Sequence, residues 1–69
     1  FSGSELPQSN FKNSNLSKAN FTGALLRNAS FTGANLEDAN FTESDLRDTS
    51  INKAVLSNTI MPWGIENEN

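Results

Sequence analysis

Residues 19–42 read ANFTG ALLRN ASFTG ANLED ANFT, and they repeat one pattern every five residues. Each unit has a small residue, a mostly polar one, a large apolar one and two mostly polar ones. Extended in both directions, this frame places an apolar residue at every large position from Phe1 to Met61. The position two residues before the large one holds only Ala, Ser or Thr from Ser4 to Thr59. The fold is therefore decided by the repeat.

A period of five residues fits neither regular secondary structure. In an α-helix, residues five apart differ in direction by about 140°, so the large side chains would point all round the helix. In a continuous strand, an odd period places successive large residues on opposite faces. The chain must instead turn once per unit, so that each short edge directs one large side chain towards a common axis. This arrangement is a solenoid.

The large position alternates between phenylalanine and leucine until Ile51 replaces the expected phenylalanine. Four units per coil would give each layer two aromatic residues and two leucines, and the constant volume suits close packing. Three units per coil would mix the two residue types in each stack. We therefore expect coils of twenty residues, about 4.8 Å apart. Two opposite stacks would hold Phe1, Phe21, Phe41 and Met61, and Phe11, Phe31 and Ile51.

Units such as 34–38 (ANLED), 19–23 (ANFTG) and 44–48 (SDLRD) resemble the pentapeptide-repeat family. The family consensus is a small residue, Asp or Asn, Leu or Phe, and two variable positions. The resemblance covers about residues 1–61 in twelve units of unbroken register. It implies an all-β fold, a right-handed quadrilateral β-helix with about three coils of twenty residues.

The domain plan follows from where this frame ends. Residues 1–61 are the expected β-helix, and residues 62–69 are expected to form a C-terminal cap turn and an acidic tail that frays from Glu66 onward. Pro62 cannot donate to a further ladder, and Trp63 is placed to fold over the open end of the tube or to anchor a partner. The chain begins inside a unit and without Met, so we expect it to be a fragment or a processed protein, with Phe1 exposed.

Two features of the polar positions carry structural expectations. Gly3, Gly23 and Gly33 fall in the last position of a unit, where a turn requires unusual dihedral angles. Four Asn-x-Ser/Thr sequons arise from the repeat itself, so we expect asparagine ladders that hydrogen-bond from coil to coil rather than glycosylation. The four sequons begin at Asn15, Asn20, Asn28 and Asn40.

The residue inventory argues against an enzyme. The chain has no His and no Cys, which removes the commonest general base, the thiolate nucleophile and the usual transition-metal ligands. Its carboxylate pairs, such as Glu37 with Asp38 and Asp45 with Asp48, fall on outward positions where water screens them. No glycine loop for phosphate is present. We expect no catalytic residues, no cofactor and no metal site.

Charge bears on the possible partners. Some pentapeptide-repeat proteins act as DNA mimics that occupy a type II topoisomerase, and an acidic DNA mimic is the alternative function here. The net charge is only −3, and Arg27 and Arg47 would stack beside Asp45 and Asp48 and neutralise them locally. The five cations are scattered, so nucleic-acid binding is not expected. No apolar run reaches the length of a membrane span.

The favoured function is a structural or protein-interaction module. Three outward positions that commonly hold Asn or Asp hold Leu25, Val55 and Ile60 instead. Val55 and Ile60 would lie near Trp63 at the C-terminal end, where they form a protein-binding or homodimer patch or are covered by the terminal turn. The ending 59–64 (TIMPWG) is similar to that of cyanobacterial and plant thylakoid-lumen members. This similarity implies the thylakoid lumen or the cytoplasm of a photosynthetic organism.

Overall fold

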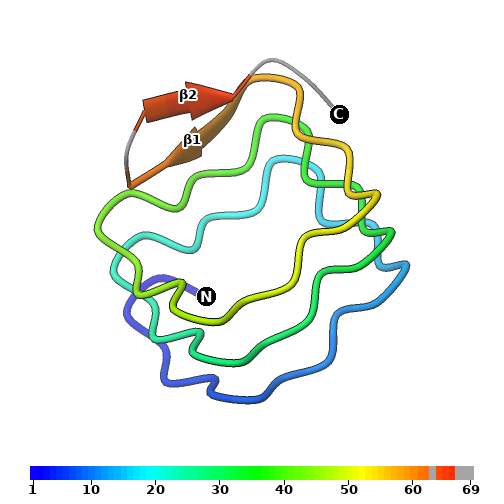
Figure 1. Cartoon of the computed structure of the whole chain (residues 1–69). Helices are drawn as coiled ribbons and strands as arrows, with labels where there is room; N and C mark the ends of the chain where they lie inside the picture. Colours follow the sequence, from blue (N-terminus) through cyan, green and yellow to red (C-terminus); the bar gives the residue numbers. More distant parts are fainter. Residues whose placement is uncertain (63, 67–69) are drawn as a thin grey trace.

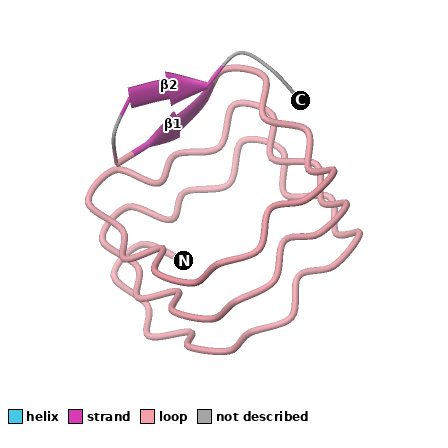
Figure 2. Ribbon diagram, in the orientation of Figure 1, coloured by secondary structure: helices cyan, strands magenta, loops and turns pink. Residues whose placement is uncertain are grey.

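The computed structural model describes residues 1–62 and 64–66, with side chains described through Pro62. The chain winds through stacked coils in sequence order and ends in a hairpin (Figures 1 and 2). The hairpin strands are β1 (Thr59–Met61) and β2 (Gly64–Glu66). The described residues contain no helix. The architecture is therefore a β-helix solenoid, as the repeat predicts.

Parallel bridges join residues that are twenty positions apart, such as Glu5 with Leu25 and Leu25 with Asp45. One coil of chain therefore takes twenty residues, or four units. Each unit contributes a single bridging residue, because the chain turns on both sides of it. The bridging residues form four columns: Glu5–Leu25–Asp45, Asn10–Ser30–Ser50, Asn15–Asn35–Val55 and Asn20–Asn40–Ile60.

The same backbone hydrogen bonds between coils recur in each unit from residues 4–8 to residues 34–38. The Leu25 N–H donates to the Ser4 carbonyl at 2.8 Å, and the Leu6 N–H donates to the Leu25 carbonyl at 2.8 Å. Two residues further on, the Gln8 N–H donates to the Arg27 carbonyl at 2.8 Å. Each of these units thus makes three bonds to the next coil, which satisfies backbone groups that would otherwise be costly to bury.

The phenylalanine rings form the two predicted stacks at the centre of the coils. The rings of Phe21 and Phe41 are stacked at a centroid distance of 4.8 Å, and those of Phe11 and Phe31 at 5.0 Å. Across the axis, Phe21 meets Phe31 edge-on at 5.6 Å. Both geometries are favourable, and each aromatic pair contributes about 0.5–1.5 kcal/mol beyond the burial of its apolar area. The predicted stacking is confirmed.

The small positions of the middle coil are buried beside these large side chains, as are most of those in the last coil. Ala24 and Ala34 are fully buried, and so is Thr59. The buried hydroxyl groups donate to backbone carbonyls, Thr59 Oγ1 to Leu36 at 2.7 Å and Ser44 Oγ to Phe41 at 2.8 Å. In the part of the chain that the structure describes, no buried side-chain N or O lacks a partner. Ser44 and Thr59 fit this buried position because each hydroxyl group finds an acceptor.

The last position of the units adopts a left-handed backbone conformation. Gly23 has φ of 70°, as expected for glycine, but non-glycine residues such as Lys53 (φ 62°) do the same. From the sequence, we predict this conformation only at the glycines. Chain closure requires it in each turn, whichever residue is present, and positive φ at the third turn residue is what a type II turn demands. The non-glycine members are Gln8, Asn13, Lys18, Asn28, Asp38, Glu43, Asp48, Lys53 and Asn58.

The prediction of asparagine ladders between coils is wrong for the side chains that the structure describes. Asn20 Oδ1 accepts from the Thr22 N–H at 2.9 Å and from the Thr22 hydroxyl at 2.6 Å. Asn40 makes the same two bonds to Thr42 within its own coil. An Asx turn places the amide oxygen beside the backbone two residues on, so the local donor is the closer partner.

The C-terminal hairpin ends the coil. β1 lies on the previous coil, with the Ile60 N–H donating to the Ala39 carbonyl at 2.9 Å, and β2 pairs antiparallel with β1. Had the repeat continued, Glu66 would fall in the buried large position, where an unpaired carboxylate is very costly. The chain reverses instead. The pairing includes Glu66, so the expected tail is wrong at that residue. The cap role was predicted for Trp63, which lies outside the described residues, as do residues 67–69.

Candidate interaction surface

The structure divides the predicted binding residues between two surfaces. Leu25 is 43% exposed and lies in the middle of the Glu5–Leu25–Asp45 column. Val55 and Ile60 lie at the last coil, in neighbouring columns, where Val55 is half-buried and Ile60 is 37% exposed. The pairing of β2 with β1 therefore leaves Ile60 accessible. Trp63, the fourth predicted residue, is outside the described residues.

A cluster of one carboxylate and two guanidinium groups lies beside Leu25. Arg27 Nε donates to Asp45 Oδ2 at 2.8 Å across the coils. Arg47 donates to the same carboxylate from Nε at 3.0 Å and from Nη2 at 2.8 Å, and its backbone N–H donates at 3.2 Å. The Asp45 side chain is only 18% exposed, whereas Arg27 and Arg47 are 55% and 66% exposed. Both oxygens of Asp45 are thus engaged.

These contacts set the electrostatics of the cluster. The pKa of Asp45 is held well below its ordinary value. The largest cause is the hydrogen bond from the Arg47 side chain, and the second is the hydrogen bond from Arg27. The hydrogen bond to Asp45 raises the pKa of Arg47 above its ordinary value, and the charge of Asp48 adds a smaller increase. Asp45 is therefore ionised and paired at neutral pH. The equivalent positions of the two arginines in the repeat predict this neutralisation.

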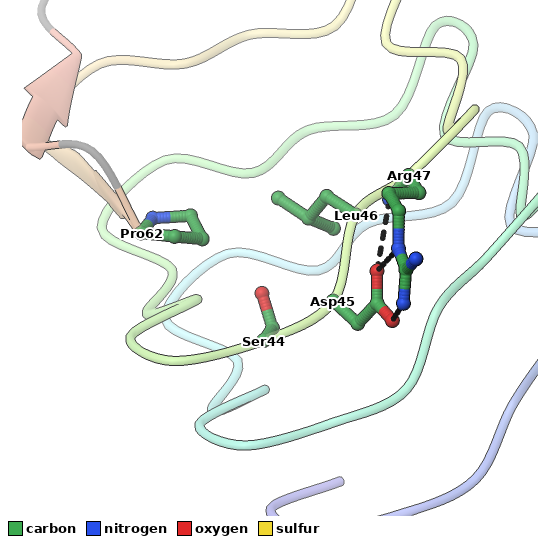
Figure 3. A pocket seen from close by; sticks show the side chains of 5 residues that line it. All are labelled: Ser44, Asp45, Leu46, Arg47 and Pro62. Carbon is green, nitrogen blue, oxygen red and sulfur yellow. Dashed lines mark hydrogen bonds and ion pairs between the residues drawn. The ribbon is translucent and has the colours of Figure 1, made fainter.

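Two hollows lie along this same column. One has a volume of about 240 Å³ and is lined by Glu5, Pro7, Leu25 and Arg27. The other, of about 420 Å³, lies where the hairpin leaves the coil. Figure 3 shows Leu46 and Pro62 facing each other across the second hollow, with Arg47 folded onto Asp45 at its far side. Sequence reasoning missed both hollows, although the twenty-residue spacing places Pro7, Arg27 and Arg47 in line.

The remaining polar groups of the described residues form no cluster that could bind a metal ion. No three carboxylates come together as candidate metal ligands within residues 1–62. Among the described residues there is also no helix of the length and apolar character that would cross a bilayer.

The comparison with protein families agrees with this architecture. A family model described as "Pentapeptide repeat region" matches residues 1–60. The chain therefore belongs to the pentapeptide-repeat family. Membership of this family suggests a repeat-protein module for protein interactions. No curated protein and no solved structure shows a significant match to it.

Proposed function

We propose that this chain is a non-enzymatic structural or protein-interaction module, built as a right-handed quadrilateral β-helix of about three coils. The bridging pairs twenty residues apart and their grouping into four columns support the four-sided form. Closely bonded coils make a stiff rod whose outward positions can present side chains at fixed places. Within residues 62–69, the proposed C-terminal cap and tail, the described Glu66 pairs with Thr59 as part of β2.

The observation that supports an interaction role best is the exposure of Leu25. Its N–H and C=O are both bonded to the first coil, to Ser4 and Leu6, so its place on the surface is fixed. The adjacent Pro7 and Arg27 give the hollow an apolar wall and a cationic edge. Because the backbone at Leu25 is already ordered, a partner that binds there need not order it, and an apolar hollow with a charged edge suits a contact surface. We propose that a partner protein covers Leu25 and that Arg27 contacts its acidic groups.

The alternative, an acidic DNA mimic that inhibits a type II topoisomerase, is less favoured. A DNA mimic must present carboxylates at about the phosphate density of a duplex, roughly one charge per 1.7 Å. The Asp45 carboxylate is instead bonded to two arginines. This pairing removes charge from the column that would have to resemble a phosphate backbone.

Two further proposals concern context. Val55 and Ile60 at the C-terminal coil end provide a surface for a partner or a homodimer, and the exposure of Ile60 supports it. Trp63, the third residue predicted for this surface, lies outside the described residues. The ending at residues 59–64 supports an origin among cyanobacterial or thylakoid-lumen members of the family, and hence the lumen or cytoplasm of a photosynthetic organism.

The proposed function is tested by affinity purification from a photosynthetic extract, comparing the natural chain with Leu25→Asp and Ser30→Asp. Ser30 occupies the equivalent bridging position in the next column and serves as the control. We expect Leu25→Asp to lose the bound proteins and Ser30→Asp to keep them, with equal thermal stability. Equal recovery by both variants would contradict the role of Leu25. Specific recovery of a topoisomerase would favour the DNA mimic.

A further inference from the structure

The first two units of the last coil, residues 44–53, carry an open backbone edge that we name the ledge. One coil below, the Asp45 N–H donates to the Ala24 carbonyl at 2.9 Å, and the Leu26 N–H donates to the Asp45 carbonyl at 2.9 Å. Among the described residues, the equivalent groups of the ledge make no such bond to a further coil. The open donors are the N–H groups of Leu46, Asp48, Ile51 and Lys53, and the open acceptors are the carbonyls of Ser44 and Thr49.

The first coil carries the complementary open edge on its opposite face. In the coil above it, the Leu25 N–H donates to the Ser4 carbonyl, and the Leu25 carbonyl accepts from the Leu6 N–H, both at 2.8 Å. Glu5 and Asn10 hold the same place in the first coil. Their N–H and carbonyl groups have no backbone partner in the part of the chain that the structure describes. The groups that the ledge needs as partners are thus present on the first coil.

Pro7 lies on this open edge and fits it. The bond at its position uses only a carbonyl, since one coil above the Arg27 carbonyl accepts from the Gln8 N–H at 2.8 Å. Pro7 lacks only an N–H, which the stacking of coils does not use there. With twenty residues per coil, residues 4–13 of a second copy would lie over residues 44–53. The Pro7 carbonyl would then accept from the Asp48 N–H.

The apolar side chains match in the same register. Leu6 and Leu46 are half-buried, whereas Leu26, which lies between them in the stack, is fully buried. A second copy would place its Leu6 on Leu46. It would also place its Phe11 on Ile51, which is half-buried as well. The hollow of about 420 Å³ in Figure 3 is the space that the first of these units would fill.

Charge favours a second copy at this place. Between described coils, Arg27 Nε donates at 2.8 Å to Asp45 Oδ2, eighteen residues further on. In the same register, the partner of Arg47 is Glu5 of the second copy. Within the described residues, Arg47 Nη1 makes no hydrogen bond and Glu5 makes no ion pair. Glu5 would also lie over Asp45, so that Arg47 would bridge the two carboxylates.

We propose that the first coil of a second copy is the partner of the ledge, and that β2 is the stop that limits this head-to-tail contact. A contact between two different ends leaves one end free on each copy, so it continues into a filament unless it is stopped. The inference goes beyond the proposed interaction role of Leu25, which lies on the side of the coils, and does not depend on it.

β2 takes the place that the second copy needs on another side of the coil. The Ile60 N–H donates to the Ala39 carbonyl, and the Ile60 carbonyl accepts from the Phe41 N–H at 2.6 Å, so this edge of β1 faces the coil below. β2 pairs with the other edge of β1, where the next coil would lie, with Ile65 opposite Ile60. Residues 19–21 of a second copy would need the same place. Covering an open edge in this way protects it against association.

A smaller overlap lies at the first residue of the second copy. Met61 is 3% exposed and follows Phe41 in the stack, so it holds the place that Phe1 of the second copy would take. Phe1 is 54% exposed, so little buried area is lost if it moves aside. The departure of β2 is therefore the main requirement for stacking.

The first test opens the hairpin in the full chain. Because the Ile60 backbone is bonded to the coil below, the hairpin bonds fall at the pairs on either side of it, which include Gly64 and Glu66. Gly64→Pro with Glu66→Pro removes the N–H donors of β2, and Gly64→Ala with Glu66→Ala is the matched control. In sedimentation equilibrium, we expect the proline variant to associate about tenfold more tightly than the control or the natural chain, the scale of two hydrogen bonds.

The second test uses the proline variant to examine the charges. Arg47→Gln should weaken association by about fivefold, the upper range of an exposed ion pair, and Arg27→Gln, one coil lower, should have a smaller effect. Glu5→Gln should also weaken association when Arg47 is present. In the Arg47→Gln background it should strengthen association, because Glu5 and Asp45 would otherwise repel each other. Effects of Glu5→Gln with the same sign in both backgrounds would overturn the placement of Glu5 beside Arg47.

The third test examines the register by disulfide formation between two different chains. Lys12→Cys in one chain would lie over Asn52→Cys in the other, at the coil spacing of about 4.8 Å. Ser17→Cys would lie one column away and serves as the control. Chains with Lys12→Cys and Asn52→Cys should link faster than chains with Ser17→Cys and Asn52→Cys. The natural chain should show the same preference more slowly at millimolar concentration, so the test does not require that the proline variant folds.

Three results would overturn the proposal. One is a folded proline variant that stays monomeric at millimolar concentration, with no preference between the cysteine pairs. Another is equal association of the natural chain and the proline variant, because β2 would then not be the stop. The last is faster linking of Asn52→Cys to itself, because two ledges would then face each other in a symmetric dimer. The interaction role of Leu25 stands or fails by its own experiment.

Discussion

The middle coil and the first coil share one sequence pattern but differ greatly in burial. In the middle coil, Phe21 and Leu26 are fully buried. Twenty residues earlier, in the equivalent positions of the first coil, Phe1 is 54% exposed and Leu6 is half-buried. The difference arises because a middle coil has neighbours on both sides. Burial in this fold therefore comes from stacking, and each coil depends on the next.

The largest expected effect on stability comes from substituting phenylalanines of one stack. Phe31→Ala leaves a cavity in a fully packed layer and should lower the free energy of unfolding by about 3–5 kcal/mol. Phe11→Ala, in the same stack but half-buried, should cost about half as much, because less apolar area is lost. Urea unfolding followed by circular dichroism measures both. Equal costs would contradict the dependence of burial on stacking.

A second test compares two hydroxyl groups that point to the coil below. Thr59 Oγ1 donates to the Leu36 carbonyl at 2.7 Å in a buried site, and Thr49 Oγ1 donates to Leu26 at 2.8 Å in a half-buried one. Thr59→Val should lower the free energy of unfolding by about 1–2 kcal/mol, because the carbonyl loses its buried partner. Thr49→Val should cost less, since water can reach the site. The reverse order in thermal unfolding would contradict this account.

A third test separates backbone conformation from packing at two glycines. Gly23 and Gly33 both have positive φ, but a Cβ on Gly33 would meet the side chain of Asn13, whereas one on Gly23 meets nothing within 4 Å. Gly23→Ala should cost about 1 kcal/mol from backbone strain alone. Gly33→Ala should cost slightly more in the natural chain, and its cost should fall to the Gly23→Ala value when Asn13→Ala is the reference protein. The reference is needed because Asn13 also has a positive φ, so Asn13→Ala carries a strain of its own. A larger effect at Gly23 would show that strain is not the common cause.

The smallest expected effect is the pH dependence from the cluster beside Leu25. The pKa of Asp45 is lowered in the folded state, so its contribution to stability is present above the unfolded value of about 3.9 and is lost as pH falls below it. The urea midpoint of the natural chain should therefore fall more between pH 5 and pH 2 than that of Asp45→Asn. Asp48→Asn, which keeps the pairs to Asp45, is the control. Identical pH profiles for all three proteins would contradict a stabilising role for the pairs.

Much of this architecture follows from the five-residue frame. The alternation of Phe and Leu predicts which rings stack, and the small positions predict which residues are buried. The left-handed turns at Lys18 or Glu43 were not predicted, because chain closure imposes them on residues with no preference for them. The asparagine bonds were predicted wrongly, since the frame gives the column of a side chain but not its nearest donor.

The candidate surfaces were only partly predictable. The frame identifies Leu25 and Ile60 as apolar residues in outward positions, and the structure shows both exposed. It also aligns Arg27 with Arg47. The ledge could not be found from the repeat, because it depends on how the chain leaves the coil. The hairpin reverses at Pro62, and this reversal leaves Leu46 and the open edge beside it uncovered.

The central claim is that one coil takes twenty residues, so that residues twenty apart lie directly above each other. Paired cysteine variants test it: Glu37→Cys with Ser57→Cys, twenty apart, and Glu37→Cys with Asn52→Cys, fifteen apart. The coil spacing of about 4.8 Å is within the Cα separation of a disulfide. Under mild oxidation of the folded monomer, we predict rapid disulfide formation in the first pair and little in the second. Faster formation in the second pair would contradict the twenty-residue coil.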